Sequence, residues 1–135
     1  MEITGKITAG LCREETMTVG VHHTARALGS GSLLVLGTPA MTALMEQAAT
    51  NLAQALLPEG WTSVGTMLSV EHVAATPVEA NVRAVAKVEA VEGRRLRYTV
   101  EAFDEAGLIG RGSHERYVVE TEKFMAKAQD KLNKK

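Results

Sequence analysis

The chain has 135 residues, of which 45% are hydrophobic and 23% are charged, and its formal net charge is −1. This is the size and composition of one globular domain over residues 1–135, and so small a net charge gives no general attraction for nucleic acid or anionic membranes. The single cysteine, Cys12, excludes an internal disulfide framework and favours a reducing cytoplasm. The four histidines lack the spacing of metal ligands, so we expect no metal site.

The first half of the chain predicts two strands followed by one long helix. Residues 14–27 alternate apolar and polar side chains as a strand does, and a short apolar strand is expected at residues 33–36, after a loop of glycine and serine. Thr38 then supplies a hydroxyl N-cap, and Pro39 is favoured in the first helical position. The helix is expected to cover residues 39–57 and to end before the next proline.

The second half of the chain shows the period-two alternation of a sheet. The expected strands cover residues 62–75, 79–91, 94–104 and 108–120, and residues 121–135 are expected to form an amphipathic C-terminal helix. Because the loops between these strands are short, neighbouring strands should run antiparallel.

Side-chain parity predicts which face of this sheet is buried. A three-residue bulged turn at Gly93 sets even-numbered residues opposite even-numbered ones, whereas a two-residue turn sets arginines opposite apolar residues and is rejected. The apolar face then consists of Val82, Ala84, Ala86, Val88, Leu96, Tyr98, Val100 and Ala102, continued by Gly110, Gly112, His114 and Arg116. The glycines leave room for a helix. We therefore expect an α+β domain in which an antiparallel sheet wraps around one long central helix.

Glu46 is the only charged side chain within residues 33–58. A buried lone carboxylate costs several kcal/mol unless it is paired, hydrogen-bonded or protonated. Even the wetter side of this helix is neutral, which predicts burial on all sides or a protein interface there. Glu46 is therefore a candidate for chemistry.

Several short motifs surround these positions. They are Gly37-Thr38-Pro39-Ala40-Met41, Leu44-Met45-Glu46, Gly65-Thr66-Met67, Val70-Glu71-His72, Thr76-Pro77 and His114-Glu115-Arg116. With these motifs, the chain resembles the hotdog-fold thioesterases, in particular the group typified by fluoroacetyl-CoA thioesterase. The resemblance implies a hotdog fold, a catalytic group of Thr38, Glu46 and His72, and substrate contacts at Gly65 and Arg116. It implies an acyl-CoA substrate and no cofactor, because coenzyme A is part of the substrate.

Thioester hydrolysis needs a base or nucleophile, a donor for the developing oxyanion and a dry acyl pocket. We expect Glu46 to be the base or the nucleophile, His72 to carry a proton or a hydrogen bond, and Thr38 to hold the oxyanion or orient the acid. The fluoroacetyl-specific member has aromatic lid residues where this chain has residues 29–32, Gly-Ser-Gly-Ser. A broader hydrolase of small or medium acyl-CoA, working as a homodimer or a dimer of dimers, is therefore expected.

Each site residue also has an ordinary interpretation. Thr38 taken alone is a helix cap, Glu46 taken alone can form an ion pair with Arg116, and His72 taken alone is a satisfied core histidine. Two other functions remain open on the same fold, a non-catalytic acyl-CoA-binding protein and a dehydratase of 3-hydroxyacyl thioesters. The cations that would contact coenzyme A are also open among Arg94, Arg95, Arg97, Arg111 and the C-terminal lysines.

Overall fold

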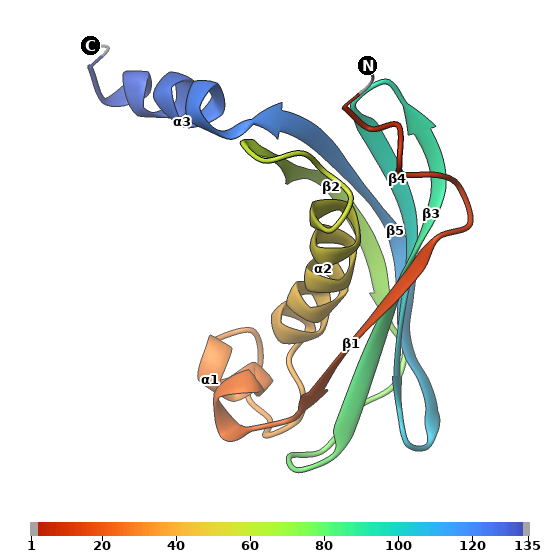
Figure 1. Ribbon diagram of the computed structural model, residues 1–135. Coiled ribbons are helices and arrows are strands. Elements are labelled where there is room, and N and C mark those ends of the chain that lie inside the picture. Colours follow the sequence, from red (N-terminus) through yellow and green to blue (C-terminus); the bar gives the residue numbers. More distant parts are fainter. Residues whose placement is uncertain (1–2, 134–135) are drawn as a thin grey trace.

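The computed structural model describes residues 3–133, and its main feature is a five-stranded antiparallel sheet curved around one helix (Figure 1). The strands are β1 (Cys12–Thr18), β2 (Trp61–His72), β3 (Asn81–Glu92), β4 (Arg95–Asp104) and β5 (Gly107–Glu120), in the spatial order β1-β3-β4-β5-β2. The helices are α1 (Ala25–Leu28), the central α2 (Thr38–Gln54) and α3 (Thr121–Gln129). This arrangement confirms the predicted α+β architecture.

The core lies between α2 and the concave face of the sheet. Met41, Met45 and Ala48 are fully buried on α2, and they pack with the even-numbered residues of β3 and β4. A Cβ atom at Gly110 of β5 would lie 2.5 Å from the Met41 sulfur, so the glycine is what allows the helix to approach. Burial of each large apolar side chain contributes about 1.5–3 kcal/mol. The predicted apolar face of β3 and β4 is therefore confirmed, and so is the room that Gly110 leaves for the helix. A Cβ atom at Gly112 would instead meet the backbone of Ser69 and Val70 in β2, so this glycine serves the contact between two strands.

The N-terminal prediction of one strand over residues 14–27 is wrong beyond Thr18. A short 3-10 turn (Val21–His23) follows, and α1 then begins at Ala25. The hydroxyl of Thr24 accepts a hydrogen bond from the Ala27 amide at 3.2 Å, so Thr24 caps the helix. The expected strand at residues 33–36 is reduced to isolated bridges that join Leu36 to Thr24 and Val35 to Pro77.

The β3–β4 hairpin corrects the predicted turn. Glu92 pairs directly with Arg95, so the turn has two residues, and the rejection of that turn was wrong. An irregularity between Val88 and Ala90 inserts one extra residue, which restores the even-to-even pairing and places Val88 opposite Tyr98. The faces are therefore as predicted, while the partner of each residue is shifted along the strand.

A second bulge interrupts β2 between Gly65 and Met67. Before the bulge the odd-numbered residues of β2 face inward, and after it the even-numbered ones do. Gly65 and His72 therefore both face α2. Unbroken period-two alternation over the predicted strand at residues 62–75 would place Val64 on the same face as His72, but Val64 pairs with the exposed Tyr117 on the outer face. The strand also ends at His72, three positions before the predicted end.

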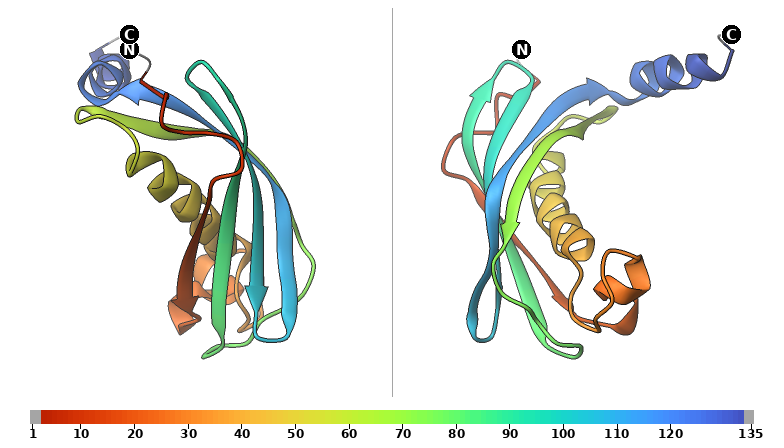
Figure 2. Two further views of the ribbon diagram at one scale, coloured as in Figure 1. Left: turned by 45° about the vertical axis from the view of Figure 1, so that its right-hand side comes forward. Right: turned by 180° about the vertical axis from the view of Figure 1, so that it is seen from behind.

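The C-terminal helix extends from the end of β5 away from the sheet (Figure 2). α3 ends at Gln129 and continues as a 3-10 turn (Asp130–Asn133), so the predicted helix is shorter than expected, and residues 134–135 lie outside the described part. Within residues 3–133, no helix combines the length and the apolar character needed to cross a membrane.

Candidate active site

Thr38 and His72 form the first half of the site. Thr38 is the first residue of α2 and His72 the last residue of β2, and the Thr38 hydroxyl lies 2.8 Å from His72 Nδ1. The helix is capped by Gly37, without a side-chain cap, so the interpretation of Thr38 as the N-cap is wrong. The cap position falls one residue earlier, and the hydroxyl is therefore free to bind the imidazole.

A pocket opens beside this pair. Its volume is about 360 Å³, which is at the small end of the range for ligand pockets. Its walls come from α1, the loop after it, the start of α2 and the end of β2, and include Ser30, Val35, Thr38, His72 and Ala74. Most of the residues that line it are apolar, and Ser30, Thr38 and His72 carry polar groups, so the space can hold a small acyl group.

The surroundings of His72 favour the neutral form of its imidazole. Burial lowers the pKa of His72 below its ordinary value of 6.5. A neutral imidazole has one donor and one acceptor nitrogen, and Nδ1 is engaged by Thr38. Within the described residues the buried Nε2 has no hydrogen-bond partner, so His72 is not a satisfied core histidine.

Glu46 forms the second half of the site, on the next turns of α2. A Cβ atom at Gly65 would lie 3.0 Å from Glu46 Oε2 and 3.4 Å from Arg116 Nη1, so the glycine leaves the space in which the carboxylate lies. Glu46 is half-buried rather than enclosed. No ion pair joins it to Arg116 among the described residues, so the interpretation of Glu46 as half of a structural ion pair is wrong.

Arg116 is buried, with 6% of its surface exposed. Its Nε donates to the Ser63 hydroxyl at 2.8 Å and its Nη2 donates to the Ser63 carbonyl at 3.0 Å. Its Nη1 lies 3.2 Å from Nε2 of His114, which is itself 1% exposed. The guanidinium is therefore bound to the protein from several sides, with one side toward Gly65 and Glu46.

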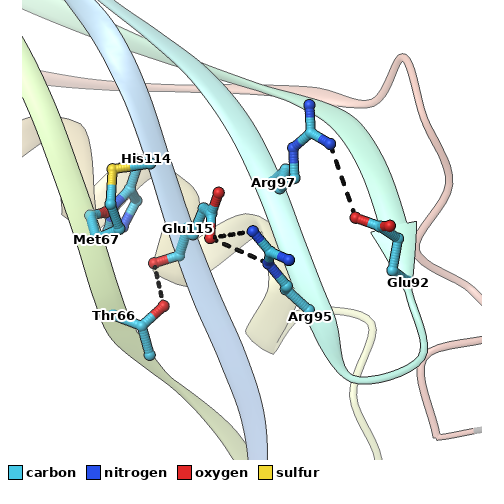
Figure 3. A network of polar contacts seen from close by, with 7 residues as sticks. All are labelled: Thr66, Met67, Glu92, Arg95, Arg97, His114 and Glu115. Atoms are coloured by element: carbon cyan, nitrogen blue, oxygen red, sulfur yellow. Dashed lines mark hydrogen bonds and ion pairs between the residues drawn. The ribbon is translucent and has the colours of Figure 1, made fainter.

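His114 also lies in this cluster, although its sequence pattern predicted only a place on the buried face of the sheet and no role in the site. Its Nδ1 is 2.8 Å from the Met67 carbonyl, beside the bulge of β2. Figure 3 shows His114 and Met67 together, with the Thr66 hydroxyl donating to the Glu115 carbonyl across the same two strands. The signal for His114 was its inward parity beside Arg116.

Thr38 and Glu46 are eight residues apart on one helix. That spacing corresponds to about 12 Å along the axis and about 80° around it. One chain therefore brings Thr38 together with His72, and Glu46 together with Gly65 and Arg116. In residues 3–133 no hydrogen bond joins Glu46 to either Thr38 or His72.

The arginines considered for coenzyme A all have partners within the chain. Arg95 pairs with Glu115 at 2.8 Å and Arg97 with Glu92 at 3.7 Å, as Figure 3 shows. Arg111 pairs with Glu71, and Arg94 lies over the Trp61 ring. In the part of the chain that the structure describes, no group of His, Cys, Asp and Glu residues is placed to hold a metal ion.

Comparisons with known proteins give consistent matches. The model of the fluoroacetyl-CoA-specific thioesterase family, FlK, matches residues 12–122. The fluoroacetyl-CoA thioesterase of Streptantibioticus cattleyicolor is 43% identical over 97 residues, which are 72% of this chain and 70% of that protein.

Solved structures give the same match. The fluoroacetyl-CoA thioesterase FlK aligns with a TM-score of 0.87 and 37% identity, over 93% of this chain and 97% of that chain. A hot-dog-like protein from Thermanaerovibrio acidaminovorans aligns over 100% of both chains, with a TM-score of 0.90 and 26% identity. A thioesterase superfamily member from Thermus thermophilus has a TM-score of 0.87 and 29% identity over 94% of both chains. The hotdog fold is thereby confirmed.

Proposed function

Since the chain belongs to the fluoroacetyl-CoA-specific thioesterase family and is a thioester hydrolase, we propose that it cleaves small or medium acyl-CoA thioesters to the free acid and coenzyme A. The observation that carries this proposal is the Thr38–His72 hydrogen bond at the mouth of a pocket of about 360 Å³. Small and polar residues at positions 29–32 stand where the fluoroacetyl-specific member has aromatic residues, which supports a broader range of acyl groups.

We propose that Glu46 is the base or the nucleophile. As a base it takes a proton from water, whose oxygen attacks the thioester carbonyl carbon; as a nucleophile its own oxygen attacks, and water then hydrolyses the resulting anhydride. The amide of Thr38 binds the oxyanion, because Pro39 has no N–H and the amides of Ala40 and Met41 already donate to the Gly37 carbonyl. The Thr38 hydroxyl donates to Nδ1 of His72 and so leaves the proton of the imidazole on Nε2. The tetrahedral intermediate then expels the coenzyme A thiolate, which takes a proton carried by His72.

Gly65 and Arg116 are proposed to support substrate binding beside Glu46. The absent side chain at Gly65 leaves room next to the carboxylate for the acyl group. Arg116 is too buried to reach the phosphates of coenzyme A. Its positive charge therefore acts from the protein interior on the space beside Gly65 and Glu46. No cofactor is expected, because coenzyme A is part of the substrate. A cytoplasmic location stays a prediction based on Cys12, which is free and exposed.

We also propose that two copies of the chain complete the site, as a homodimer or as one half of a dimer of dimers. β2 is an edge strand, and residues 65–69 in its middle are exposed even though some of them face inward. Long exposed edge strands readily pair with another chain. Antiparallel pairing about a twofold axis near Met67 would bring His72 of the second copy toward the half of β2 that contains Gly65, and thus toward Glu46.

Exchange of Glu46 for Gln tests the proposal. It removes the acid but keeps the size of the side chain, so we expect release of free thiol from small acyl-CoAs to fall by about 10²-fold or more, the usual range for a general base. Gln47→Ala, on the exposed side of the same turn, is the matched control and should keep wild-type turnover. Unchanged hydrolysis by a folded Glu46→Gln protein would refute the assignment. Acyl-CoA binding without thiol release by the wild type would favour a non-catalytic binding protein.

A further inference from the structure

A chain of largely buried hydrogen bonds lies behind Gly65, and of its members only Arg116 has a part in the chemistry proposed above. It runs from the Met67 carbonyl to His114 Nδ1, from His114 Nε2 to Arg116 Nη1, and from Arg116 to Ser63. His114 and Arg116 are both nearly inaccessible to solvent. The same guanidinium nitrogen that reaches His114 is the one that faces the space beside Gly65 and Glu46.

The two neighbours of His114 require the same arrangement of its protons. A guanidinium has only donors, so His114 Nε2 must be the acceptor in the contact of 3.2 Å with Arg116. The proton of the neutral ring then lies on Nδ1, where it is donated to the Met67 carbonyl at 2.8 Å. A doubly protonated ring would set an N–H against the N–H of Arg116. Burial also lowers the pKa of His114 below 6.5, in the same direction.

The bulge of β2 is what makes this chain of bonds possible. It leaves Thr66 without a pairing partner between Gly65 and Met67, and the Met67 carbonyl directly after it lies 2.8 Å from His114 Nδ1. The Thr66 hydroxyl binds the Glu115 carbonyl at 3.2 Å and holds the bulge against β5. The His114 ring is thus held by the Met67 carbonyl of β2 at Nδ1 and by the Arg116 side chain at Nε2.

We propose that His114 is a positioning residue: by accepting the Nη1 hydrogen bond it holds the Arg116 guanidinium at a constant place beside Gly65, so that the positive charge of Arg116 acts on the Glu46 carboxylate from across the space that the glycine leaves. This inference rests on the proposed thioesterase function and on the role of Glu46 in it. The competing explanation is that His114 only fills the core, where its ring stacks on the ring of Tyr98 with 5.9 Å between the two ring centroids.

Two substitutions separate these explanations, because each keeps one half of the imidazole. His114→Gln places an amide oxygen near the position of Nε2 and can still accept from Arg116, whereas His114→Asn reaches only the position of Nδ1 and keeps the bond to Met67. We expect His114→Asn to lower kcat roughly tenfold with KM changed less than about twofold, and His114→Gln to recover most of kcat. Equal kcat values in the two folded variants would overturn the proposal.

A double-mutant cycle keeps the test independent of stability. If His114 acts through Arg116, the loss of kcat caused by His114→Asn should disappear in an Arg116→Gln background. Val82→Ala, a buried truncation on β3, is the control for destabilisation alone and should keep kcat in the folded protein. Additive losses in the cycle, or an equal loss in Val82→Ala, would show that His114 is only structural.

The protonation of His114 gives a readout besides activity. The ¹⁵N chemical shifts of the His114 ring in the full chain should show a proton on Nδ1 and an unprotonated Nε2. In Arg116→Gln at mildly acidic pH, the ¹⁵N shift of Nε2 should show that this nitrogen has become protonated. The opposite tautomer would overturn the proposal. Activity of Glu46→Gln separates the two levels of inference: full turnover there would remove the proposed function and this inference with it, whereas an additive cycle beside an inactive Glu46→Gln would remove only this inference.

Discussion

Among the protein groups around Gly65, substitution by Ala should displace mainly the Glu46 carboxylate, and the loss of room for the acyl group should appear in KM. The added Cβ would lie 3.0 Å from Glu46 Oε2, and an ordinary contact begins at 3.4 Å, so the carboxylate must retreat by about 0.4 Å. A misplacement of about 1 Å can cost about 10²-fold in rate, so this retreat corresponds to roughly a sixfold loss of kcat. In free energy, that loss is about 1.1 kcal/mol of transition-state stabilisation.

The same substitution should not destabilise the fold by a comparable amount. Replacing a strand glycine by alanine contributes roughly 0.5–1 kcal/mol through the lower entropy of the unfolded chain, which offsets the tight contact. Gly110→Ala is the matched variant, because its Cβ would meet the Met41 sulfur at 2.5 Å. It should lose about 1–3 kcal/mol of stability by overpacking and keep most of its kcat.

Thiol release at saturating acyl-CoA gives kcat, and urea denaturation gives the free energy of unfolding for both variants. The expected result is opposite in the two proteins: activity falls in Gly65→Ala, and stability falls in Gly110→Ala. A folded Gly65→Ala protein with wild-type kcat would show that the position of the Glu46 carboxylate does not limit the reaction, and the reasoning about the site would fail.

Two further predictions concern the assembly and its pH dependence. If two copies share each site, Thr38→Val and Glu46→Gln should each be inactive alone. A mixture allowed to exchange subunits should recover about a quarter of wild-type activity, since half of the dimers are mixed and each mixed dimer has one intact site out of two. No recovery would mean that Thr38, His72 and Glu46 of one site all come from the same chain. Burial lowers the pKa of His72 and His114 below 6.5, so near that pH the unfolded chain binds more protons than the folded one. The free energy of unfolding should therefore fall between about pH 7.5 and about pH 5.5, by less in His114→Gln, and a stability that rises toward acid in urea denaturation would contradict this.

The buried faces were predictable because they depend on periodicity alone. Even-numbered residues of β3 and β4 are buried as expected, and Gly110 meets the central helix as expected from the small residues in its strand. These features follow from local patterns that many residues share, so a single misplaced turn did not change them.

The corrections occurred where one residue decides the geometry. An extra residue in β3 made a rejected turn acceptable, and another in β2 reversed the face expected for Val64. Bulges have no strong sequence signal, since the extra residue can be of almost any type. The chemistry of Thr38 alone did not distinguish a cap from a partner of His72, because a hydroxyl at a helix start suits both; only the family resemblance grouped the two residues.

The bulge in β2 has a consequence for related sequences. Gly65 and His72 are an odd number of positions apart, so a regular strand would send them to opposite faces, and only the inserted residue returns both to one side. Deletion of Thr66 would leave an even interval, so a straight strand would still send both residues to one face; straightening the strand with Thr66 retained would turn one of them outward. Among relatives, an even interval between this glycine and this histidine therefore predicts a straight strand, and an odd interval predicts that the kink has been kept.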